Sequence, residues 1–311
     1  MTSSPFFSVI MPVYNKEPYI RDTISSVLAQ TFSSYEVVMI GGVSSDNTDV
    51  ICQEFVDKDP DVFRFARQTG KGVSNARNDG ILAARGRYVA FLDADDLWVP
   101  EYLEVMEQLI ADFPDASMYS CGYQCVENDG SVITHPHKIL RGYIDYFQWA
   151  KWIHTSGLVV NREIVISIGL FKTEYNYGED IDLMARLALS GKVVHDPKIC
   201  ESYRIGIPDS LCNGGMKNIF LPVPGEPELF SVNRTPQITR FHEQQILGTV
   251  MANLITGYRK EARTQLRWVK VYGRNKARLY RLLTYVPTPV FLRIHLWYNT
   301  YIWDKNSKLS Q

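Results

Sequence analysis

The sequence predicts an α/β fold, in which a mostly parallel sheet is flanked by helices and followed by a C-terminal helical extension. Two patterns predict this class. Over residues 1–100, short apolar runs alternate with segments whose apolar residues recur at helical spacing. From residue 237 onward only the helical spacing remains. Alternating strands and helices favour a doubly wound sheet, because right-handed crossovers place the helices on its faces.

Each element of the first part follows from a local signal. The first expected strand ends at Pro12, and the helix after it has Ile20, Ile24 and Val27 on one face. The run at 88–92 is apolar throughout, which is typical of a strand buried inside a parallel sheet. In chain order we expect strands at 7–11, 35–40, 63–66 and 88–92, and helices at 17–31, from residue 46 and at 74–84.

The middle of the chain is less regular, and its tail is helical. We expect strands at 116–121 and 157–160, a hairpin arm at 132–134 and a helix at 179–190. Apolar stripes then recur at helical spacing over 247–258 and over Phe291, Ile294, Trp297, Tyr298 and Tyr301. The sequence therefore predicts two domains, residues 1–236 and 237–311.

Composition excludes several classes of protein. With 45% hydrophobic and 22% charged residues among 311, the chain is neither mainly disordered nor a coiled coil. Its five cysteines form no CxxC pair and no Cys/His cluster, which favours reduced thiols. No basic leader opens the chain, and no apolar stretch reaches the roughly 18–20 residues that a membrane span needs. We therefore expect a cytoplasmic protein.

Charge is segregated along the chain. Residues 240–311 hold 13 lysines and arginines against three acidic residues, a net charge of +10, whereas the whole chain carries −1. A basic tail behind an acidic body predicts contact with a polyanion. An anionic membrane surface on the cytoplasmic side is one candidate, because Trp297, Tyr298 and Tyr301 favour the headgroup level. Neutralisation of the acidic body and packing in a homodimer are the alternatives.

Three carboxylates, Asp93, Asp95 and Asp96, directly follow the apolar run at 88–92. Ligands of such sheets bind outside the carboxyl ends of the strands. Like charges this close repel one another unless a cation is present, and Mg²⁺ takes one or two carboxylates together with substrate phosphates. The pattern predicts a divalent-cation site. The alternative is an N-cap for the helix that begins near Pro100.

Four motifs, taken together and in this order, resemble the inverting family-2 glycosyltransferases, which have the GT-A fold. The resemblance covers residues 6–211. The motifs are Ser8-Val-Ile-Met-Pro-Val-Tyr-Asn15, Gly72-Val-Ser-Asn-Ala-Arg-Asn-Asp-Gly80, the D-x-D segment Phe91-Leu-Asp-Ala-Asp-Asp-Leu-Trp98 and the late Gly178-Glu-Asp-Ile-Asp-Leu183. Each motif is weak alone, whereas their order and spacing make the resemblance specific.

The resemblance implies a reaction and a set of partners. A sugar would move from a nucleotide-diphosphate sugar donor to a hydroxyl of a glycan or lipid-linked acceptor, in polysaccharide or glycolipid synthesis. The cofactor would be Mn²⁺ or Mg²⁺, which neutralises the leaving nucleoside diphosphate. The resemblance argues against a nucleic-acid partner.

The resemblance also implies roles for single residues. Asp180 would be the general base that deprotonates the acceptor, and Glu179 would position it; acidic residues here also suit the first turn of a helix. Asp95 and Asp93 would hold the metal. The nucleotide-binding set would be Pro12, Val13, Tyr14, Arg77, Asp93 and Arg204. Trp98 and Trp152 would be sugar platforms, with a plain core role as the alternative for each.

Two departures from the family pattern bear on the donor and the metal. Where the family usually has two aspartates, this chain has Gly41 and Gly42, so the carboxylate that recognises the base is missing. Backbone groups or Asp46 are the candidates to replace it, and the donor's base and sugar stay open. A histidine that often follows the late Tyr-Arg is absent after Arg204, so the metal would lose a ligand.

Two other functions are therefore considered. A catalytically degenerate GT-A domain would bind a nucleotide or glycan without transfer, and both departures favour it. The carboxylate pairs argue against it, because a pure binder needs no base. A nucleotidyltransferase would need a glycine-rich loop near the first strand, which residues 12–16 lack.

Overall fold

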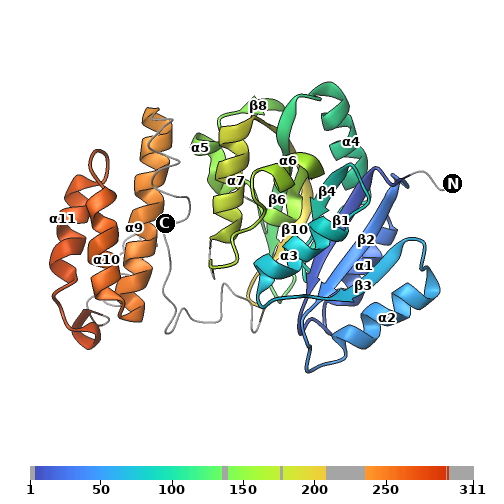
Figure 1. The fold of residues 1–311 in the computed structure, drawn as a ribbon, viewed down its shortest axis with the longest axis horizontal. Helices are drawn as coiled ribbons and strands as arrows, with labels where there is room; N and C mark the ends of the chain where they lie inside the picture. Colours follow the sequence, from blue (N-terminus) through green and yellow to red (C-terminus); the bar gives the residue numbers. More distant parts are fainter. Residues whose placement is uncertain (1–3, 135–138, 176–177, 208–234, 292, 294–311) are drawn as a thin grey trace. The chain divides into compact units, whose positions relative to one another are not determined.

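The structure is a computed structural model that describes residues 4–134, 139–175, 178–207, 235–291 and 293 (Figure 1). It divides the chain into two compact units, residues 1–214 and 215–311. The first unit contains a ten-stranded sheet with helices on both faces, and the second is helical. The α/β class and the helical C-terminal part are confirmed. The domain boundary expected between residues 236 and 237 stays a prediction.

The first part of the sheet is parallel, as the alternating pattern predicted. The strand β1 (Phe7–Val13) lies between β2 (Tyr35–Gly41) and β4 (Tyr88–Phe91), and β2 also pairs with β3 (Phe63–Arg67). The helices α1 (Ile20–Leu28), α2 (Thr48–Lys58) and α3 (Val73–Ala83) connect these strands. Because β1 and β4 are parallel neighbours, the loops that follow them meet at one edge of the sheet.

The second part makes the sheet mixed. The short strand β9 (Leu158–Asn161) is antiparallel to both its neighbours, β4 and β6 (Ala116–Val126), and β10 (Lys192–Arg204) is parallel to β6. The strand order is β3-β2-β1-β4-β9-β6-β10-β5, with β5 (Leu97–Trp98) at the end. Two short strands, β7 (Val132–Thr134) and β8 (Gly142–Ile144), pair with β6 and β10. The expected strand at 157–160 and hairpin arm at 132–134 are thus confirmed.

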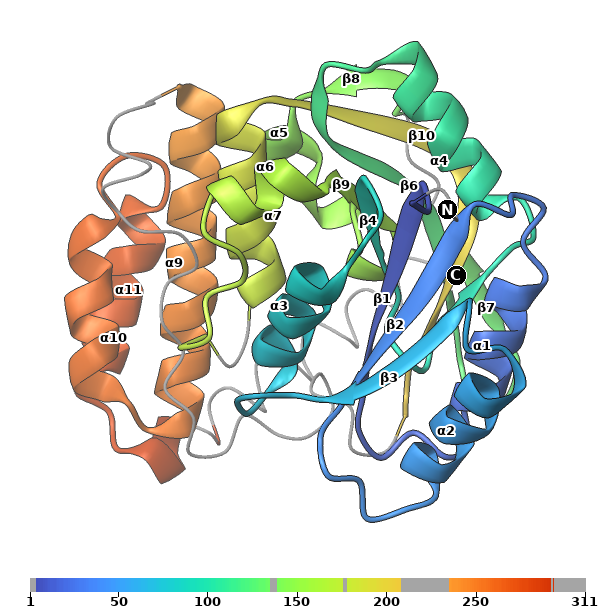
Figure 2. The same cartoon turned by 45° about the vertical axis from the view of Figure 1, so that its right-hand side comes forward.

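The remaining helical segments of this unit are α4 (Tyr102–Asp112), α5 (Tyr146–Trp149), η1 (Ala150–Trp152), η2 (Thr155–Gly157), α6 (Arg162–Ser167) and α7 (Glu179–Ser190). Figure 2 shows α1, α2 and α4 on one face of the sheet, and α3, α6 and α7 on the other. The helix predicted at 179–190 is confirmed as α7.

Both faces of β1 are closely packed. Its residues Phe7, Val9 and Met11 are fully buried in the core beneath α1, α2 and α4. On the opposite face α3 approaches so closely that a Cβ on Gly80 would lie 2.4 Å from Cγ2 of Ile10. Only glycine fits there without a shift, so Gly80 sets the distance between α3 and the sheet. Four described cysteines, Cys52, Cys121, Cys125 and Cys200, are buried free thiols, as expected.

The second unit consists of α9 (Pro236–Thr256), α10 (Arg259–Gln265), η3 (Leu266–Trp268) and α11 (Arg274–Leu283). They enclose their own apolar core, and the carboxylate of Glu243 accepts hydrogen bonds from the backbone N–H groups of residues 270–273. Within the described residues, no helix combines the length and apolar character required to cross a bilayer.

The apolar stripe predicted for a membrane surface is wrong at Phe291. This side chain is 2% exposed and packs in the core of the second unit, so it cannot meet a headgroup. The other members of the stripe, Ile294, Trp297, Tyr298 and Tyr301, lie outside the described residues.

Candidate active site

Asp93, Asp95 and Asp96 follow β4 directly, and side chains from distant segments of the first unit meet them there. Three parts of this site have different chemistry. Arg77 binds two of the carboxylates, Lys16 pairs with a third, and a half-buried histidine lies beside a fourth. Their contacts decide which groups are charged and which can reach a ligand.

Arg77 connects two of the predicted acidic residues. It lies on α3 and is 3% exposed, and its two terminal nitrogens donate to Asp93 at 2.8 Å and to Glu179 at 2.9 Å. Its guanidinium also lies over the ring of Phe171, 5.3 Å from the centroid. Burial by itself would raise the pKa of Asp93, but the Arg77 charge outweighs it and lowers that pKa, so Asp93 is an anion. A direct contact of Arg77 with a nucleotide stays a prediction.

Glu179 and Asp180 begin α7 in different surroundings. Gly178, with φ at +76°, turns the chain into the helix in a conformation that favours glycine. Glu179 is buried against Arg77, and burial together with the charge of Asp180 raises its pKa. Asp180 is half-buried and accepts hydrogen bonds from Thr155 Oγ1 at 3.1 Å and Ile181 N at 2.7 Å. Asp180 is thus the one of the pair that remains open to solvent.

Asp95 faces the loop that follows β1. Its Oδ2 lies 2.7 Å from Nζ of Lys16, and the two side chains are 15% and 17% exposed. Within the described part of the chain, Lys16 is its one ionic partner. By contrast, both carboxylate oxygens of Asp93 accept from Arg77, at 2.8 and 3.1 Å. A carboxylate oxygen of this kind is a ligand that a hard divalent cation prefers.

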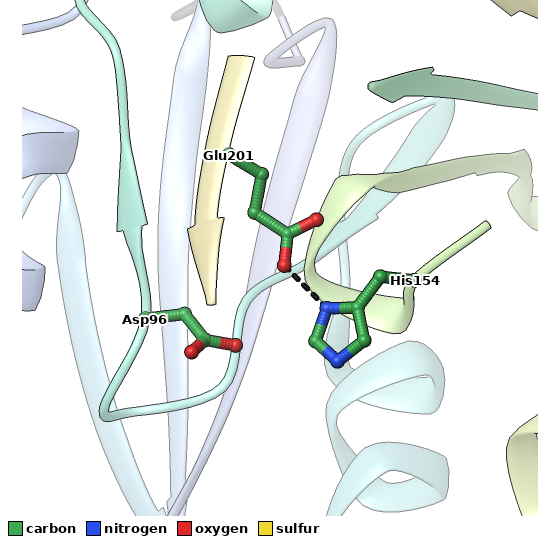
Figure 3. A group of neighbouring side chains, drawn as sticks. All are labelled: Asp96, His154 and Glu201. Carbon is green, nitrogen blue, oxygen red and sulfur yellow. Dashed lines mark hydrogen bonds and ion pairs between the residues drawn. The ribbon is translucent and has the colours of Figure 1, made fainter. Parts of the chain in front are cut away.

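Asp96 turns into the interior toward His154 and Glu201 (Figure 3). Asp96 and Glu201 are fully buried, and His154 Nδ1 is hydrogen-bonded to Glu201. One ligand atom from each of the three residues lies within 4.8 Å of the others, a set that could hold a metal ion. Asp96 also accepts from Ser156 Oγ at 2.6 Å and from the Arg204 backbone N–H at 3.1 Å.

Burial and neighbouring charges shift the pKa values of Asp96 and His154 in this group. Burial raises the pKa of Asp96 well above its usual range, and the neighbouring charge of His154 acts in the opposite direction. Burial opposes a charge on His154, but the Glu201 carboxylate outweighs burial and raises the pKa of His154 to about 10. The group thus contains one ion pair, between His154 and Glu201. Asp95 as a metal ligand stays a prediction.

Residues 154–156, in and before η2, hold the site together. Ser156 Oγ accepts from the Asp93 backbone N–H at 3.0 Å and donates to Asp96, while Thr155 donates to Asp180. The sequence analysis missed this segment, Lys16 and Glu201. No periodicity or motif marks residues 154–156, because their partners lie 25 to 63 positions away in the chain.

The predicted nucleotide-binding residues differ in accessibility. Val13 is 2% exposed and packs in the core, so its side chain cannot wall a base, contrary to the prediction. Tyr14 is 59% exposed and Pro12 is half-buried, so both keep an open surface. Arg204 donates to Asp22 at 3.0 Å and lies over the ring of Tyr19; its contact with a phosphate stays a prediction.

Trp98 belongs to the core rather than to a sugar platform. Its ring is 4% exposed and stacks on Tyr102 with a centroid distance of 4.0 Å, and its Nε1 donates to the Ser156 carbonyl at 2.6 Å. The core role was the alternative for this residue, and the structure favours it. Trp152 is half-buried at the end of η1, and its role as a platform stays a prediction.

Aromatic rings fill the space beside Gly41 and Gly42. A Cβ on Gly41 would lie 2.6 Å from Cε2 of Phe65, and one on Gly42 would lie 3.0 Å from Cδ2 of Tyr14. Asp46 accepts hydrogen bonds from Thr48 and from the Glu17 backbone N–H, and its role in recognising the base stays a prediction. Backbone groups are the other candidate for recognition of the base.

The family model for glycosyl transferase family 2 matches residues 8–165, just over half of the chain. The chain belongs to glycosyl transferase family 2. The matched stretch contains Arg77 and the aspartates after β4, and α7 lies beyond it. Membership confirms the resemblance that the four motifs indicated.

Curated relatives match this family member over part of their own length. An uncharacterized glycosyltransferase of Rickettsia typhi is 28% identical over 212 residues, which are 66% of this chain and 65% of that protein. The Escherichia coli UDP-Glc:alpha-D-GlcNAc-diphosphoundecaprenol beta-1,3-glucosyltransferase WfgD is 37% identical over 134 residues, 42% of this chain and 52% of that enzyme. The chain thus spans less than two thirds of the length of these relatives.

Solved structures share the fold. TarS of S. aureus, residues 1–349 in complex with UDP-GlcNAc, aligns over 90% of this chain and 89% of its own with a TM-score of 0.65 and 16% identity. The mannosyltransferase PcManGT of Pyrobaculum calidifontis, in complex with GDP-Man and Mn²⁺, aligns over 98% and 89% with a TM-score of 0.58 and 18% identity. At these identities the likeness shows the fold alone.

Proposed function

We propose that this family-2 member is a metal-dependent, inverting glycosyltransferase. It moves a sugar from a nucleotide-diphosphate donor to a hydroxyl of a glycan or lipid-linked acceptor. One observation carries the proposal: a single network of contacts joins the accessible Asp95 loop to the half-exposed Asp180, through Ser156, Thr155 and the Arg77 bridge. A pure nucleotide binder would not need a solvent-accessible base beside that loop.

The two ends of the network have separate tasks in this proposal. Asp180 accepts the proton of the acceptor hydroxyl, and Glu179, held by Arg77, keeps it in place. Attack from the side opposite the leaving group inverts the anomeric carbon. A divalent cation, Mn²⁺ or Mg²⁺, would be held by Asp95 and would neutralise charge on the departing diphosphate. In this proposal Asp93, kept anionic by Arg77, accepts from the ribose or assists at the metal.

The substrate class is inferred from the relatives and the site. WfgD transfers glucose from UDP-glucose onto a diphosphoundecaprenol-linked sugar, as its name states, and TarS and PcManGT were crystallised with UDP-GlcNAc and GDP-Man. These names support a nucleotide-diphosphate hexose as donor and a lipid-linked or polysaccharide acceptor. The base is open, because Gly41 and Gly42 carry no side chain to select it.

A peripheral position on the cytoplasmic face of an anionic membrane forms part of the proposal. The helix α11 and the residues after it expose Leu279, Leu282 and Tyr285, at 54%, 68% and 68%. The described residues of this unit, 235–291 and 293, include 11 lysines and arginines against two glutamates. Basic and apolar side chains on one unit are typical of peripheral attachment, which would bring the enzyme to lipid-linked acceptors.

The test is a transfer assay with UDP- and GDP-hexoses, a lipid-diphosphate sugar acceptor, and Mn²⁺ or EDTA. We expect Mn²⁺-dependent release of nucleoside diphosphate that requires the acceptor, and its loss in Asp95→Asn with an unchanged melting temperature. Nucleotide binding without release for every donor would instead favour the degenerate domain. Release of pyrophosphate would indicate a nucleotidyltransferase.

A further inference from the structure

The loop that carries Lys16 is fixed at its backbone by the segment before α2. Asn15, with φ at +49°, donates its backbone N–H to Ser44 Oγ at 3.2 Å and accepts from the Ser45 N–H at 2.8 Å. The Lys16 N–H donates to Thr48 Oγ1 at 2.7 Å. The backbone position of Lys16 is therefore set. Its four-carbon side chain has several rotatable bonds, so the ammonium can still change position.

The ammonium of Lys16 lies where a cation bound to Asp95 would be expected. It is 2.7 Å from Asp95 Oδ2 in a pair that is mostly shielded from water, with side-chain exposures of 17% and 15%. An ammonium and a divalent cation on one carboxylate repel each other, and this repulsion is strong where water is scarce. Binding of a metal to Asp95 therefore requires that Lys16 move away.

We propose that Lys16 is a positioning residue whose ammonium is the counter-ion of Asp95. It keeps the metal from binding tightly to Asp95 until the donor has bound. In the free protein its ammonium neutralises Asp95 and weakens the binding of metal alone. When a nucleotide diphosphate enters, its phosphates attract the ammonium, and Asp95 becomes free for the metal. The inference rests on the proposed function in one respect, that Asp95 is the metal ligand.

Arg77, another cation of this site, cannot take this role. Its guanidinium is 3% exposed and is held by Asp93 and Glu179 on one side and the Phe171 ring on the other. Moving it would leave two buried carboxylates without a partner, which is costly. Lys16 has one ionic partner within the described residues, so its transfer from Asp95 to a phosphate exchanges one anion for another.

The experiment measures binding of Mn²⁺ alone, by electron paramagnetic resonance of the free ion, without nucleotide. Lys16→Met keeps the length of the stem and removes the charge, so we expect Mn²⁺ to bind at least about tenfold more tightly than to the wild type. Lys16→Arg retains a cation at Asp95 and should match the wild type. Lys58→Met, an exposed lysine at the end of α2, is the matched control and should also match it.

The second measurement is the affinity for UDP and GDP in saturating Mn²⁺. Because the ammonium should then bind the diphosphate, Lys16→Met should weaken this affinity by about tenfold or more, while Lys58→Met leaves it unchanged. Mn²⁺ affinity that is equal or lower in Lys16→Met overturns the role of Lys16. The double variant Lys16→Met, Asp95→Asn separates the two levels: if it binds Mn²⁺ as tightly as Lys16→Met, then Asp95 is not the ligand and the metal site itself is wrong.

Discussion

At the scale of single residues, a charged neighbour outweighs the effect of burial on the pKa of two groups in the site. Arg77 keeps Asp93 anionic against the effect of burial, and Glu201 keeps His154 protonated in the same way. Burial raises the pKa of Asp96 well above its usual range. The site therefore combines an Asp93 that is held as an anion, an Asp96 whose pKa is raised, and a half-exposed Asp180.

Exchanging the two acidic residues at the start of α7 for their amides should separate their roles. Asp180→Asn keeps the volume and removes the base, so turnover should fall by about 10²–10⁴-fold with donor affinity unchanged. Glu179→Gln should raise the donor KM or lower stability as well, because it breaks the ion pair with buried Arg77. Steady-state kinetics and nucleotide titration measure both. A larger loss of turnover in Glu179→Gln than in Asp180→Asn would reverse the assignment.

The His154–Glu201 pair should make stability depend on alkaline pH. The folded-state pKa of His154 is about 10, above the ordinary value of 6.5, so the pair contributes fully below about pH 6.5 and is lost as pH approaches 10. Within that window this group alone should lower the free energy of unfolding by up to about 1.4 kcal/mol per pH unit. Urea denaturation in EDTA at pH 7 and 9.5 measures this.

The control for that pH dependence is His154→Gln, which has no titratable ring. Its stability should fall less between pH 7 and 9.5 than that of the wild type. Glu201→Gln removes the charge that raises the pKa of His154 and should flatten the curve in the same way. Equal slopes in all three proteins would contradict the assigned ion pair.

At the scale of elements, the short segment η2 is the point where the catalytic elements meet. The preceding residue His154 contacts β10, while Thr155 and Ser156 contact α7 and the loop after β4. The consequence is that the positions of Asp93, Asp96 and Asp180 depend on one another.

Ser156→Ala should test that dependence. It removes the acceptor of the Asp93 N–H and the donor to Asp96 in a fully buried place, so we expect a loss of about 1–3 kcal/mol in unfolding free energy. Transfer activity should also decrease at temperatures where the variant is still folded, because fewer hydrogen bonds hold the loop after β4. Ser167→Ala, an exposed serine at the end of α6, is the control and should change neither property. An active, fully stable Ser156→Ala protein would show that the loop after β4 keeps its position without Ser156.

At the scale of the whole molecule, chemistry and charge belong to different units. All the acidic and basic residues of the candidate site lie in the first unit, whereas the second has its own apolar core and a strong excess of basic residues. A separate core means that the second unit can expose apolar side chains on α11 without weakening the first. That arrangement supports a unit whose task is attachment.

Attachment can be tested with vesicles. The protein should sediment with anionic vesicles at low salt, and high salt should weaken this, because charges are screened within roughly 8–10 Å at physiological salt. The double substitution Leu279→Ser, Leu282→Ser should reduce sedimentation, whereas Leu82→Ser should not, although Leu82 on α3 is similarly exposed, at 55%. Equal recovery with neutral and anionic vesicles would contradict the electrostatic part. No binding to either would favour the homodimer or charge neutralisation.

The sequence by itself determined the α/β class, most strands and helices of the first unit, and the acidic residues of the site. These depend on local patterns: apolar residues at periods of two or 3.6, and carboxylates directly after a buried strand. Lys16, Arg77 and Asp180 have no local feature that reveals their partners, which are 79, 102 and 25 positions away in Asp95, Glu179 and Thr155.

Only the tertiary structure decided those pairings, because they depend on which strands are neighbours. The antiparallel insertion of β9 beside β4 brings His154 and Ser156 to the aspartates, and no periodicity in residues 158–161 shows the direction of that strand. The same arrangement buries Val13 and Trp98, two residues whose types suit a binding site as well as a core. Sequence patterns report the neighbours along the chain. The charge, protonation and solvent accessibility of the side chains at this site are set by neighbours in space.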